Sequence, residues 1–337
     1  MRIILILKRI LRLFPVTLGV LLIVFSLMHL APGDPVELMM GEAGHVTEEE
    51  IQQLRTQYGL DKPLYVQFLK YIAKASVGDL GVSFVKKQPV TSVIASRLPA
   101  TVELTLAALI LALLIAIPVG IISAVYHYSA VDRLTTTTSL IGVSIPGFYL
   151  GIILILIFGM SFQLLPVSGR STYGAEPKIV TGFYLLDSLL TGNFKALKST
   201  MKHLILPAIT LAGATVAITV RMVRSSMLEV IRQDYIRTAR AKGLSERKVL
   251  LKHALKNALV PTVSVVSLQV GVLLGGNMII ETVFSWPGLG SLAVEAIYAR
   301  DYPLVQGIVL LYAVTYVFVN LAADIIYTYL NPRVELS

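Results

Sequence analysis

The sequence predicts an all-α membrane protein with about six transmembrane helices and a long extracytoplasmic segment after the first helix. Hydrophobic residues make up 55% of the 337 residues and charged residues only 15%, whereas soluble domains carry about 25% charged residues. The mean hydropathy is +0.75, and several uncharged runs reach the roughly 20 residues that a helix needs to cross a bilayer. Cysteine is absent, which excludes a disulfide framework and a thiolate metal site.

Six apolar segments account for the predicted spans. The first, 13–33, follows four basic residues, but its apolar run is longer than the about 7–15 residues of a signal peptide, so we interpret it as a retained span. Segment 134–169 exceeds one crossing, so its ends are expected to be loop or interface. The other predicted spans are 104–125, 204–220, 257–280 and 302–323. Four prolines interrupt these segments and are expected to kink them: Pro118, Pro146, Pro207 and Pro261.

The distribution of Lys and Arg predicts the orientation, because cytoplasmic loops carry an excess of both. The strongly basic loop 221–256 and the basic N-terminus place both termini in the cytoplasm. The predicted organisation has four parts, each defined by its place relative to the membrane. They are a first helix with a cytoplasmic N-terminus (1–33), an extracytoplasmic segment (34–99), a five-helix core containing the cytoplasmic loop 221–256 (100–330) and a cytoplasmic tail (331–337).

The long outer segment is expected to be partly helical. Thr47 is a candidate N-cap before Glu48, Glu49 and Glu50, which suit the first turn of a helix. A second stretch, 60–72, repeats apolar residues at helical spacing.

The inner loop carries the most informative pattern in the chain, with ten Lys and Arg residues against three acids over 221–256. One helix is expected from Met222 to Lys242 and ends at Gly243, since glycine accepts the left-handed conformation that closes helices. Ser245 is a candidate cap for the next helix, with Glu246 in its first turn.

Three interpretations of this loop compete. A basic amphipathic helix pair could lie on anionic lipid headgroups. A nucleic-acid-binding helix-turn-helix is disfavoured, because predicted spans flank the loop closely on both sides. A docking element for a cytoplasmic partner is the third interpretation, since the small residues Ala239, Ala241 and Gly243 would permit close approach to the backbone.

The run 234–243, DYIRTARAKG, resembles the EAA loop of importer permeases in the ATP-binding cassette superfamily, in the form found in dipeptide and oligopeptide permeases. The family pattern opens Glu-Ala-Ala and places a glycine four residues after the second alanine. Those positions are Arg237, Thr238, Ala239 and Gly243 here, so the glutamate and the first alanine are replaced. The closing Ile-x-Leu-Pro of the pattern is matched only in part, because the proline lies further along the chain, at Pro261.

Further segments resemble the same peptide branch, and most closely the first of the two permeases in dipeptide systems. They occur in the same order over nearly the whole chain. These segments are 31–35 (APGDP), 58–63 (YGLDKP), 78–81 (GDLG), 165–169 (LPVSG), 284–290 (FSWPGLG) and 331–333 (NPR).

This resemblance implies the fold of a type I ABC importer permease and the function of a pore subunit in the bacterial cytoplasmic (inner) membrane. Such a subunit carries dipeptides or oligopeptides inward by alternating access. The implied partners are a second homologous permease in a heterodimer, two ATP-binding subunits and an extracytoplasmic substrate-binding protein, within the lipid bilayer and without nucleic acid. The residues implied to couple the chain to an ATPase form one run: Arg237, Thr238, Ala239, Arg240, Ala241, Lys242 and Gly243.

The chain itself is expected to be neither an enzyme nor a cofactor-binding protein. No G-x-x-x-x-G-K-[ST] phosphate loop occurs in it, so ATP and Mg are expected in the partner subunits. The five His residues are scattered and no H-E-x-x-H motif occurs, so no catalytic or metal site is expected.

Polar and aromatic residues within or beside the later spans are candidates for a pathway or gate. They are Gln269, Asn277, Glu281, Trp286, Pro287 and Asn320. Structural roles compete with this interpretation. The amides could bond between helices, Trp286 could anchor at an outer interface, and charged residues near span ends, such as Glu103 and Glu281, could pair or snorkel. The pairs Gly147-x-x-x-Gly151 and Gly271-x-x-x-Gly275 favour close helix packing.

The sequence leaves the cargo open. Nickel chelates, glutathione and opines move through similar permeases, so each is an alternative to peptides. An ion-coupled secondary carrier is a more remote alternative, because inverted repeats and charged midplane residues are not evident. A structural assembly subunit is the third class of function.

Overall fold

The computed structural model describes residues 15, 18–30, 48–276 and 278–330. Within these ranges the chain is helical apart from loops and one isolated bridge between Val82 and Pro89. An apolar helix covers Leu18–Leu30. The remaining helices are α3 (Glu48–Tyr58), α4 (Leu64–Ala75), α5 (Val90–Val125), α6 (Ala130–Ser144), α7 (Gly147–Leu154), the π-helix η1 (Ile155–Ser161), α8 (Tyr184–Leu190), α9 (Phe194–Ile231), α10 (Asp234–Ala241), α11 (Glu246–Lys248), the π-helix η2 (Val249–Ala254), α12 (Leu255–Gly276), α13 (Met278–Val283), α14 (Leu289–Tyr298) and α15 (Tyr302–Leu330).

Four helical stretches of the described chain are long and apolar enough to cross a membrane. They are Val90–Val125, Phe194–Ile231, Glu246–Leu274 and Tyr302–Ala322. A fifth crossing is provided if α6 and the α7–η1 helix, which are bent by 102° against each other, form one broken span. With the shorter helix Leu18–Leu30, this agrees with the predicted all-α membrane protein of about six spans.

Several predicted span boundaries are wrong. The short span predicted at 204–220 is only the middle of α9, a helix of 38 residues that continues through Pro207. Segment 134–169 is not one continuous helix but two helices with a bend between them, followed by a loop at 162–169. The bend lies at Ile145, whose extended backbone (φ −81°, ψ 122°) follows from its position before Pro146, because a residue before proline avoids the helical region.

Contacts divide the chain into two compact units. Unit 1 comprises residues 1–99 and 287–317, and unit 2 comprises residues 100–286 and 318–337. In unit 1, the predicted helix after Thr47 is present as α3, and α4 begins at Leu64, later than predicted. The later start has a local cause, since Gly59 has a left-handed backbone (φ +70°) and Pro63 occupies the N-cap of α4.

The buried carboxylate of Asp301 organises the loop before α5 in unit 1. It accepts hydrogen bonds from the hydroxyl of Ser83 and from the backbone N–H groups of Phe84 (3.0 Å) and Val85 (3.2 Å). The backbone N–H of Leu304 also donates to it (3.3 Å). This single side chain therefore ties residues 83–85 to the first turn of α15.

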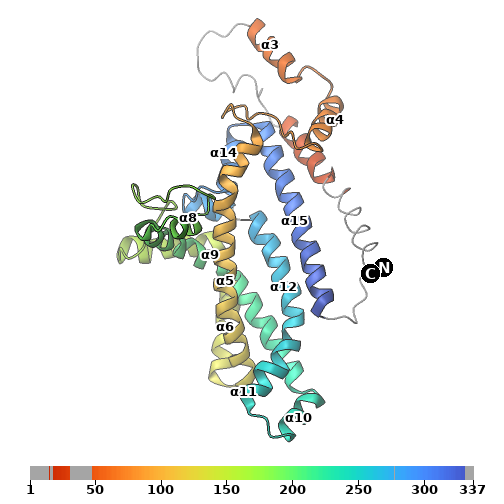
Figure 1. Cartoon of the computed structure of the whole chain (residues 1–337). Coiled ribbons are helices and arrows are strands. Elements are labelled where there is room, and N and C mark those ends of the chain that lie inside the picture. The colour runs from red at the N-terminus through yellow and green to blue at the C-terminus, as the bar shows by residue number, and fades with distance from the viewer. Residues whose placement is uncertain (1–14, 16–17, 31–47, 277, 331–337) are drawn as a thin grey trace. The chain divides into compact units, whose positions relative to one another are not determined.

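In unit 2, α9 is the central helix and packs against α6, α7, α8 and α12 (Figure 1). Glycine permits two of the close approaches. A Cβ atom at Gly120 of α5 would lie 2.7 Å from the Cβ atom of Val223 in α9, and one at Gly151 of α7 would lie 3.1 Å from the ring of Phe284. The packing interpretation of the Gly147-x-x-x-Gly151 pair therefore agrees with the structure.

Candidate functional site

The loop that joins α9 to α12 folds as a short helical elbow, residues 232–254. Helix α9 ends at Ile231, Gln233 is extended (φ −71°, ψ 150°), and α10 then covers Asp234–Ala241. The predicted single helix from Met222 to Lys242 is therefore wrong, because the extended Gln233 separates its first half, which belongs to α9, from α10. The predicted stop at Gly243 is confirmed by its left-handed backbone (φ +76°).

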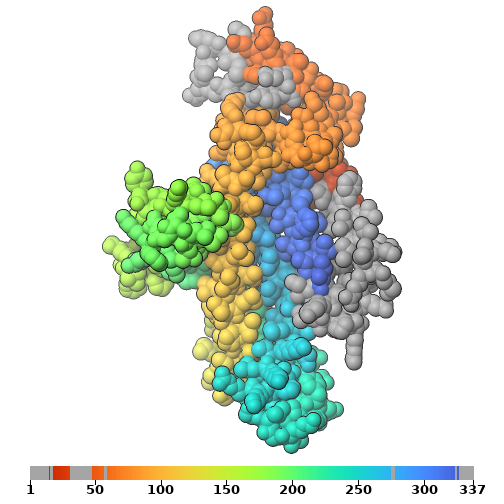
Figure 2. Space-filling view, in the orientation of Figure 1, coloured from red at the N-terminus to blue at the C-terminus, as the bar shows by residue number. Residues whose placement is uncertain are grey.

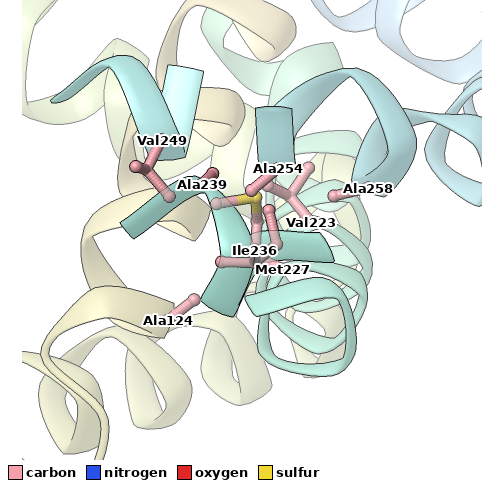
Figure 3. Close-up of a cluster of buried hydrophobic side chains, with 8 residues drawn as sticks. All are labelled: Ala124, Val223, Met227, Ile236, Ala239, Val249, Ala254 and Ala258. Atoms are coloured by element: carbon pink, nitrogen blue, oxygen red, sulfur yellow. The ribbon is translucent and has the colours of Figure 1, made fainter. Parts of the chain in front are cut away.

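A compact cluster of buried apolar side chains packs the elbow against the neighbouring helices (Figure 3). Ile236 and Ala239, three residues apart on α10, lie on the same face of that helix and are both buried. They share the cluster with residues of α5, α9, η2 and α12. Its buried members are Ala124, Val223, Met227, Ile236, Ala239, Val249, Ala254 and Ala258. Displacing α10 relative to α9 and α12 would therefore expose apolar surface, so the three helices are expected to move together.

Two polar contacts brace the elbow further. The guanidinium of Arg240 donates to the carboxylate of Glu246 at 2.6 Å (Nη2 to Oε1) and 3.1 Å (Nε to Oε2), across the turn at Gly243. The side-chain amide of Asn257 in α12 donates to the hydroxyl of Tyr235 at 2.7 Å. Ser245 occupies the predicted N-cap of α11, but its side chain accepts no capping hydrogen bond, and Glu246 pairs with Arg240 instead.

Six of the seven residues predicted to couple the chain to a partner lie on the exposed face of the elbow. They are Arg237, Thr238, Arg240, Ala241, Lys242 and Gly243. The seventh, Ala239, is only 7% exposed and belongs to the buried cluster. Its small side chain therefore lets α10 pack closely against the other helices of the cluster. In the space-filling view the elbow (teal) forms one end of unit 2 (Figure 2).

The sequence interpretation missed a partly buried ion pair between α6 and the C-terminal part of α9. Arg224 of α9 donates to both carboxylate oxygens of Asp132 in α6, at 2.6 and 2.8 Å. The same carboxylate accepts hydrogen bonds from the hydroxyl of Ser123 (2.6 Å) and the backbone N–H of Tyr128 (3.0 Å). Asp132 and Arg224 are 92 positions apart and match no local motif, so no sequence signal pairs them.

A second buried polar cluster holds the loop before α8. Arg170 donates to Glu103 of α5 at 2.6 and 3.0 Å, and its guanidinium lies 3.9 Å from the ring centroid of Tyr184. The backbone N–H of Leu185 donates to the other carboxylate oxygen of Glu103 at 2.8 Å. Glu103 therefore pairs structurally, one of the two roles that its position near a span end suggested.

The candidate pathway residues occupy different environments. Glu281 is fully buried and accepts a hydrogen bond from the hydroxyl of Thr101 at 2.7 Å. Trp286 is fully buried as well, and its indole N–H donates to the carbonyl of Ala100 at 2.9 Å. The expected anchoring of Trp286 at an outer interface is therefore wrong, because the ring packs inside unit 2 against Leu104 and Leu204.

The other candidates are more accessible. Gln269 in α12, Pro287 and Asn320 in α15 are each partly buried. Asn277 lies outside the described residues. Glu281 and Trp286 are brought together by the turn between them, in which the backbone N–H of Trp286 donates to the carbonyl of Glu281 at 2.7 Å.

Known proteins of similar sequence are membrane permeases. The chain is 44% identical over 333 residues to the dipeptide transport system permease protein DppB of Escherichia coli strain K12, a match that covers 98% of each chain. It is 46% identical over 325 residues to the di/tripeptide transport system permease protein DppB of Pseudomonas aeruginosa strain UCBPP-PA14, covering 96% of each. It is 41% identical over 331 residues to the oligopeptide transport system permease protein AppB of Bacillus subtilis strain 168, covering 98% of each.

A solved structure supports the fold. A chain of the MetNI methionine ABC transporter, in an inward facing conformation, has a TM-score of 0.51 with this chain at 18% identity, over 71% of this chain and 96% of that chain. Residues 2–105 match the N-terminal part of membrane components of binding-protein-dependent transport systems, and residues 116–336 match the inner membrane component itself. The predicted ABC importer permease is confirmed: the chain belongs to the family of binding-protein-dependent transport system inner membrane components.

Proposed function

We propose that this chain is one of two permease subunits that together form the translocation path of an ATP-driven importer for dipeptides or short oligopeptides. The cargo is inferred from relatives named for dipeptides, di/tripeptides and oligopeptides, all more than 40% identical over nearly the whole chain. The remaining subunits would be a second homologous permease, two ATP-binding subunits that carry ATP and Mg, and an extracytoplasmic substrate-binding protein. The chain would have no enzymatic activity and no cofactor of its own.

The observation that carries the proposed mechanism is the packing of the elbow, through Ile236 and Ala239 of α10, in a buried cluster shared with α9 and α12. The exposed face of α10 and the turn at Gly243 would dock on an ATP-binding subunit. The buried cluster around Ile236 and Met227 would then transmit movement of that subunit to α9 and α12, both of which are candidate spans. Alternating access requires an element with two packed arrangements, and a rigid elbow would move those two helices together.

This mechanism places the elbow and both termini in the cytoplasm. The exposed basic side chains of the elbow support that orientation, because positive charge favours the cytoplasmic side. We further propose that the side-chain amides of Gln269, Asn277 and Asn320 line the pathway. Glu281, Trp286 and Pro287 would form the turn that narrows it, with the two buried side chains holding its shape.

The docking proposal is tested by reversing charge on the exposed face of the elbow. Arg237→Glu combined with Lys242→Glu is expected to reduce co-purification of the ATP-binding subunits and to abolish uptake of a labelled dipeptide in cells that express the complete importer. Lys198→Glu, an exposed residue near the other end of α9, is the matched control. Normal uptake and co-purification by the double variant would contradict the docking role.

The cargo is tested separately. Uptake of the labelled dipeptide by the unaltered importer should be inhibited by excess unlabelled di- and tripeptides. Inhibition only by glutathione, an opine or a nickel chelate would replace the peptide proposal with one of those alternatives. Accumulation driven by an ion gradient, without the ATP-binding subunits, would contradict the ATP-driven mechanism itself.

A further inference from the structure

Unit 1 contains a cavity of about 400 Å³ between the apolar helix Leu18–Leu30, α4 and the first turns of α15. This volume lies in the range of small-ligand sites. Part of its wall is apolar: Phe25, Leu60, Leu80, Val82, Phe84 and Pro303. The other part is polar and includes the hydroxyl of Tyr71 and the side-chain amide of Gln306.

The first of these groups is the hydroxyl of Tyr71, whose oxygen is buried without a partner. Burial raises the pKa of Tyr71 well above its usual value, so the hydroxyl stays protonated and can donate a hydrogen bond. The second is the side-chain amide of Gln306, a residue only 6% exposed. Leaving a buried polar group unpaired costs about 1–3 kcal/mol, so the unpaired hydroxyl of Tyr71 indicates a bound molecule that satisfies it, and the Gln306 amide on the same cavity wall offers that molecule a second hydrogen-bonding group.

The charges around the cavity favour an anionic group. Lys74 is paired with Asp79 at 3.3 Å, and Asp79 also accepts a hydrogen bond from the backbone N–H of Gly81 at 2.9 Å. Lys70 has no acidic partner among the described residues, and its ammonium lies beside Gly59, 3.8 Å from where a Cβ atom of that glycine would be. Among the remaining polar residues of the cavity, His29 and Gln67 contact each other at 3.3 Å, and the ring of Tyr302 lies 5.2 Å from that of His29 between centroids. One uncompensated cation, the unpaired hydroxyl of Tyr71 and the amide of Gln306 therefore remain.

The surroundings indicate that the anionic group belongs to an amphiphile. Helix Leu18–Leu30 and α15 are apolar, and α4 is amphipathic with three large apolar residues exposed, Leu64, Tyr65 and Leu69. Amphipathic helices of this kind lie in the membrane interface, where lipid phosphates are found. A zwitterionic peptide fits less well, because its ammonium group would need a free carboxylate and the one acid on the cavity wall, Asp79, is already paired with Lys74.

We propose that this cavity binds one anionic phospholipid. Its phosphate would contact Lys70, the hydroxyl of Tyr71 and the amide of Gln306, and the first carbons of an acyl chain would lie against Phe25 and Phe84. The site would be independent of the peptide pathway and of the elbow.

The test is lipid retention by the complete importer, purified and transferred into vesicles of phosphatidylcholine with or without phosphatidylglycerol, then delipidated and weighed by native mass spectrometry. The unaltered protein should retain phosphatidylglycerol and not phosphatidylcholine. Tyr71→Phe and Gln306→Leu should each weaken retention about tenfold, the loss of one hydrogen bond to a charged group. Tyr65→Phe is the matched control, because Tyr65 is on the same helix, does not line the cavity and is 69% exposed.

Thermal unfolding in the same vesicles separates binding from a merely structural role. In phosphatidylcholine alone, Tyr71→Phe should leave Tm unchanged or raise it, because an unpaired buried hydroxyl is removed. Phosphatidylglycerol should raise the Tm of the unaltered protein more than that of the variant. Equal retention of phosphatidylglycerol by all variants, or equal retention of both lipids, would overturn the proposal. So would an equivalent rise in Tm with inorganic phosphate alone, or displacement of the lipid by a dipeptide.

Discussion

The guanidinium of Arg224 and the carboxylate of Asp132 face each other in a two-bond pair, with Nε 2.6 Å from Oδ1 and Nη2 2.8 Å from Oδ2. Asp132 lies in the first turn of α6, whereas Arg224 lies two turns before the end of α9. The carboxylate is 4% exposed and the guanidinium 24%. The pair therefore joins the start of α6 to the part of α9 that supports the elbow.

Replacing Asp132 by Asn should destabilise this junction. The substitution leaves Arg224 without its anionic partner, and removing one member of a buried pair costs about 3 kcal/mol. We expect a lower Tm of the purified importer, measured by tryptophan or dye fluorescence. Arg133→Gln, at the exposed neighbouring position, should leave Tm unchanged. An unchanged Tm for Asp132→Asn would mean that the pair contributes nothing to the stability of the assembled protein.

Substitutions at Gly243 should separate backbone strain from contact with a partner. A Cβ atom there would meet nothing within 4 Å in this chain, but φ is +76°, a conformation that costs most L-residues about 1–2 kcal/mol and that Asn tolerates better. Gly243→Asn should therefore keep the importer folded. If an ATP-binding subunit approaches this glycine closely, dipeptide uptake should still fall at least about tenfold, as in Gly243→Ala. Normal uptake by Gly243→Asn would show that only the backbone conformation matters.

Replacing Glu103 by Gln should release the loop before α8. The substitution replaces one carboxylate oxygen by an NH2 group and removes the negative charge that pairs with the guanidinium of Arg170, which is itself only 6% exposed. The free energy of unfolding is expected to fall by about 3 kcal/mol. Hydrogen exchange at the backbone N–H of Leu185, which donates to Glu103, should accelerate. Glu229→Gln, at an exposed position of α9, is the control. Arg170→Lys should show part of the effect, because lysine keeps the charge but loses the fork and the stacking on Tyr184.

Asp187 in α8 should make stability depend on pH. Burial alone raises the pKa of this carboxyl, but the hydrogen bonds from Thr181 and Gly182 outweigh burial and hold it below the usual value. Because the folded pKa lies below the unfolded value of about 3.9, the ionised group stabilises the protein fully above that pH. The stabilisation is lost as pH falls through the folded pKa.

Comparison with Asp187→Asn measures this contribution. At pH 6–8 the free energy of unfolding of the variant should be lower by roughly 1–3 kcal/mol, because its amide cannot accept all the hydrogen bonds that the carboxylate accepts. Its Tm should be lower accordingly. The difference should shrink below about pH 4. Glu176→Gln, an exposed position of the same loop, should show no such dependence. A difference that stays constant down to pH 3 would contradict the assignment.

Local signals in the sequence anticipated much of the fold and part of the site. Long uncharged runs predict transmembrane helices, because the hydrocarbon core of a bilayer excludes segments that are charged or that leave backbone groups without hydrogen bonds. The end of α10 next to Gly243 could be predicted because a glycine that follows a helical pattern is a local signal for a helix C-terminus. The start of α3 at Glu48 was readable because acids favour the first turn of a helix.

Other features depended on groups far apart in the chain. The break at Gln233 has no glycine or proline to mark it, and the burial of Ala239 depends on Met227 and Val249, which periodicity within α10 cannot identify. The same holds for Trp286, a candidate gate residue for which anchoring at an outer interface was the competing interpretation, whereas its indole N–H donates to the carbonyl of Ala100 inside unit 2.

The sequence by itself determined that this chain is a helical membrane permease with a strongly basic loop between two apolar segments, because hydropathy, charge clustering and the DYIRTARAKG run are properties of neighbouring residues. Only the tertiary structure decided which charges are paired, which face of α10 remains exposed and which polar groups surround the cavity in unit 1. Those properties depend on distances between side chains such as Asp132 and Arg224, or Tyr71 and Gln306, and such distances exist only once the helices are packed.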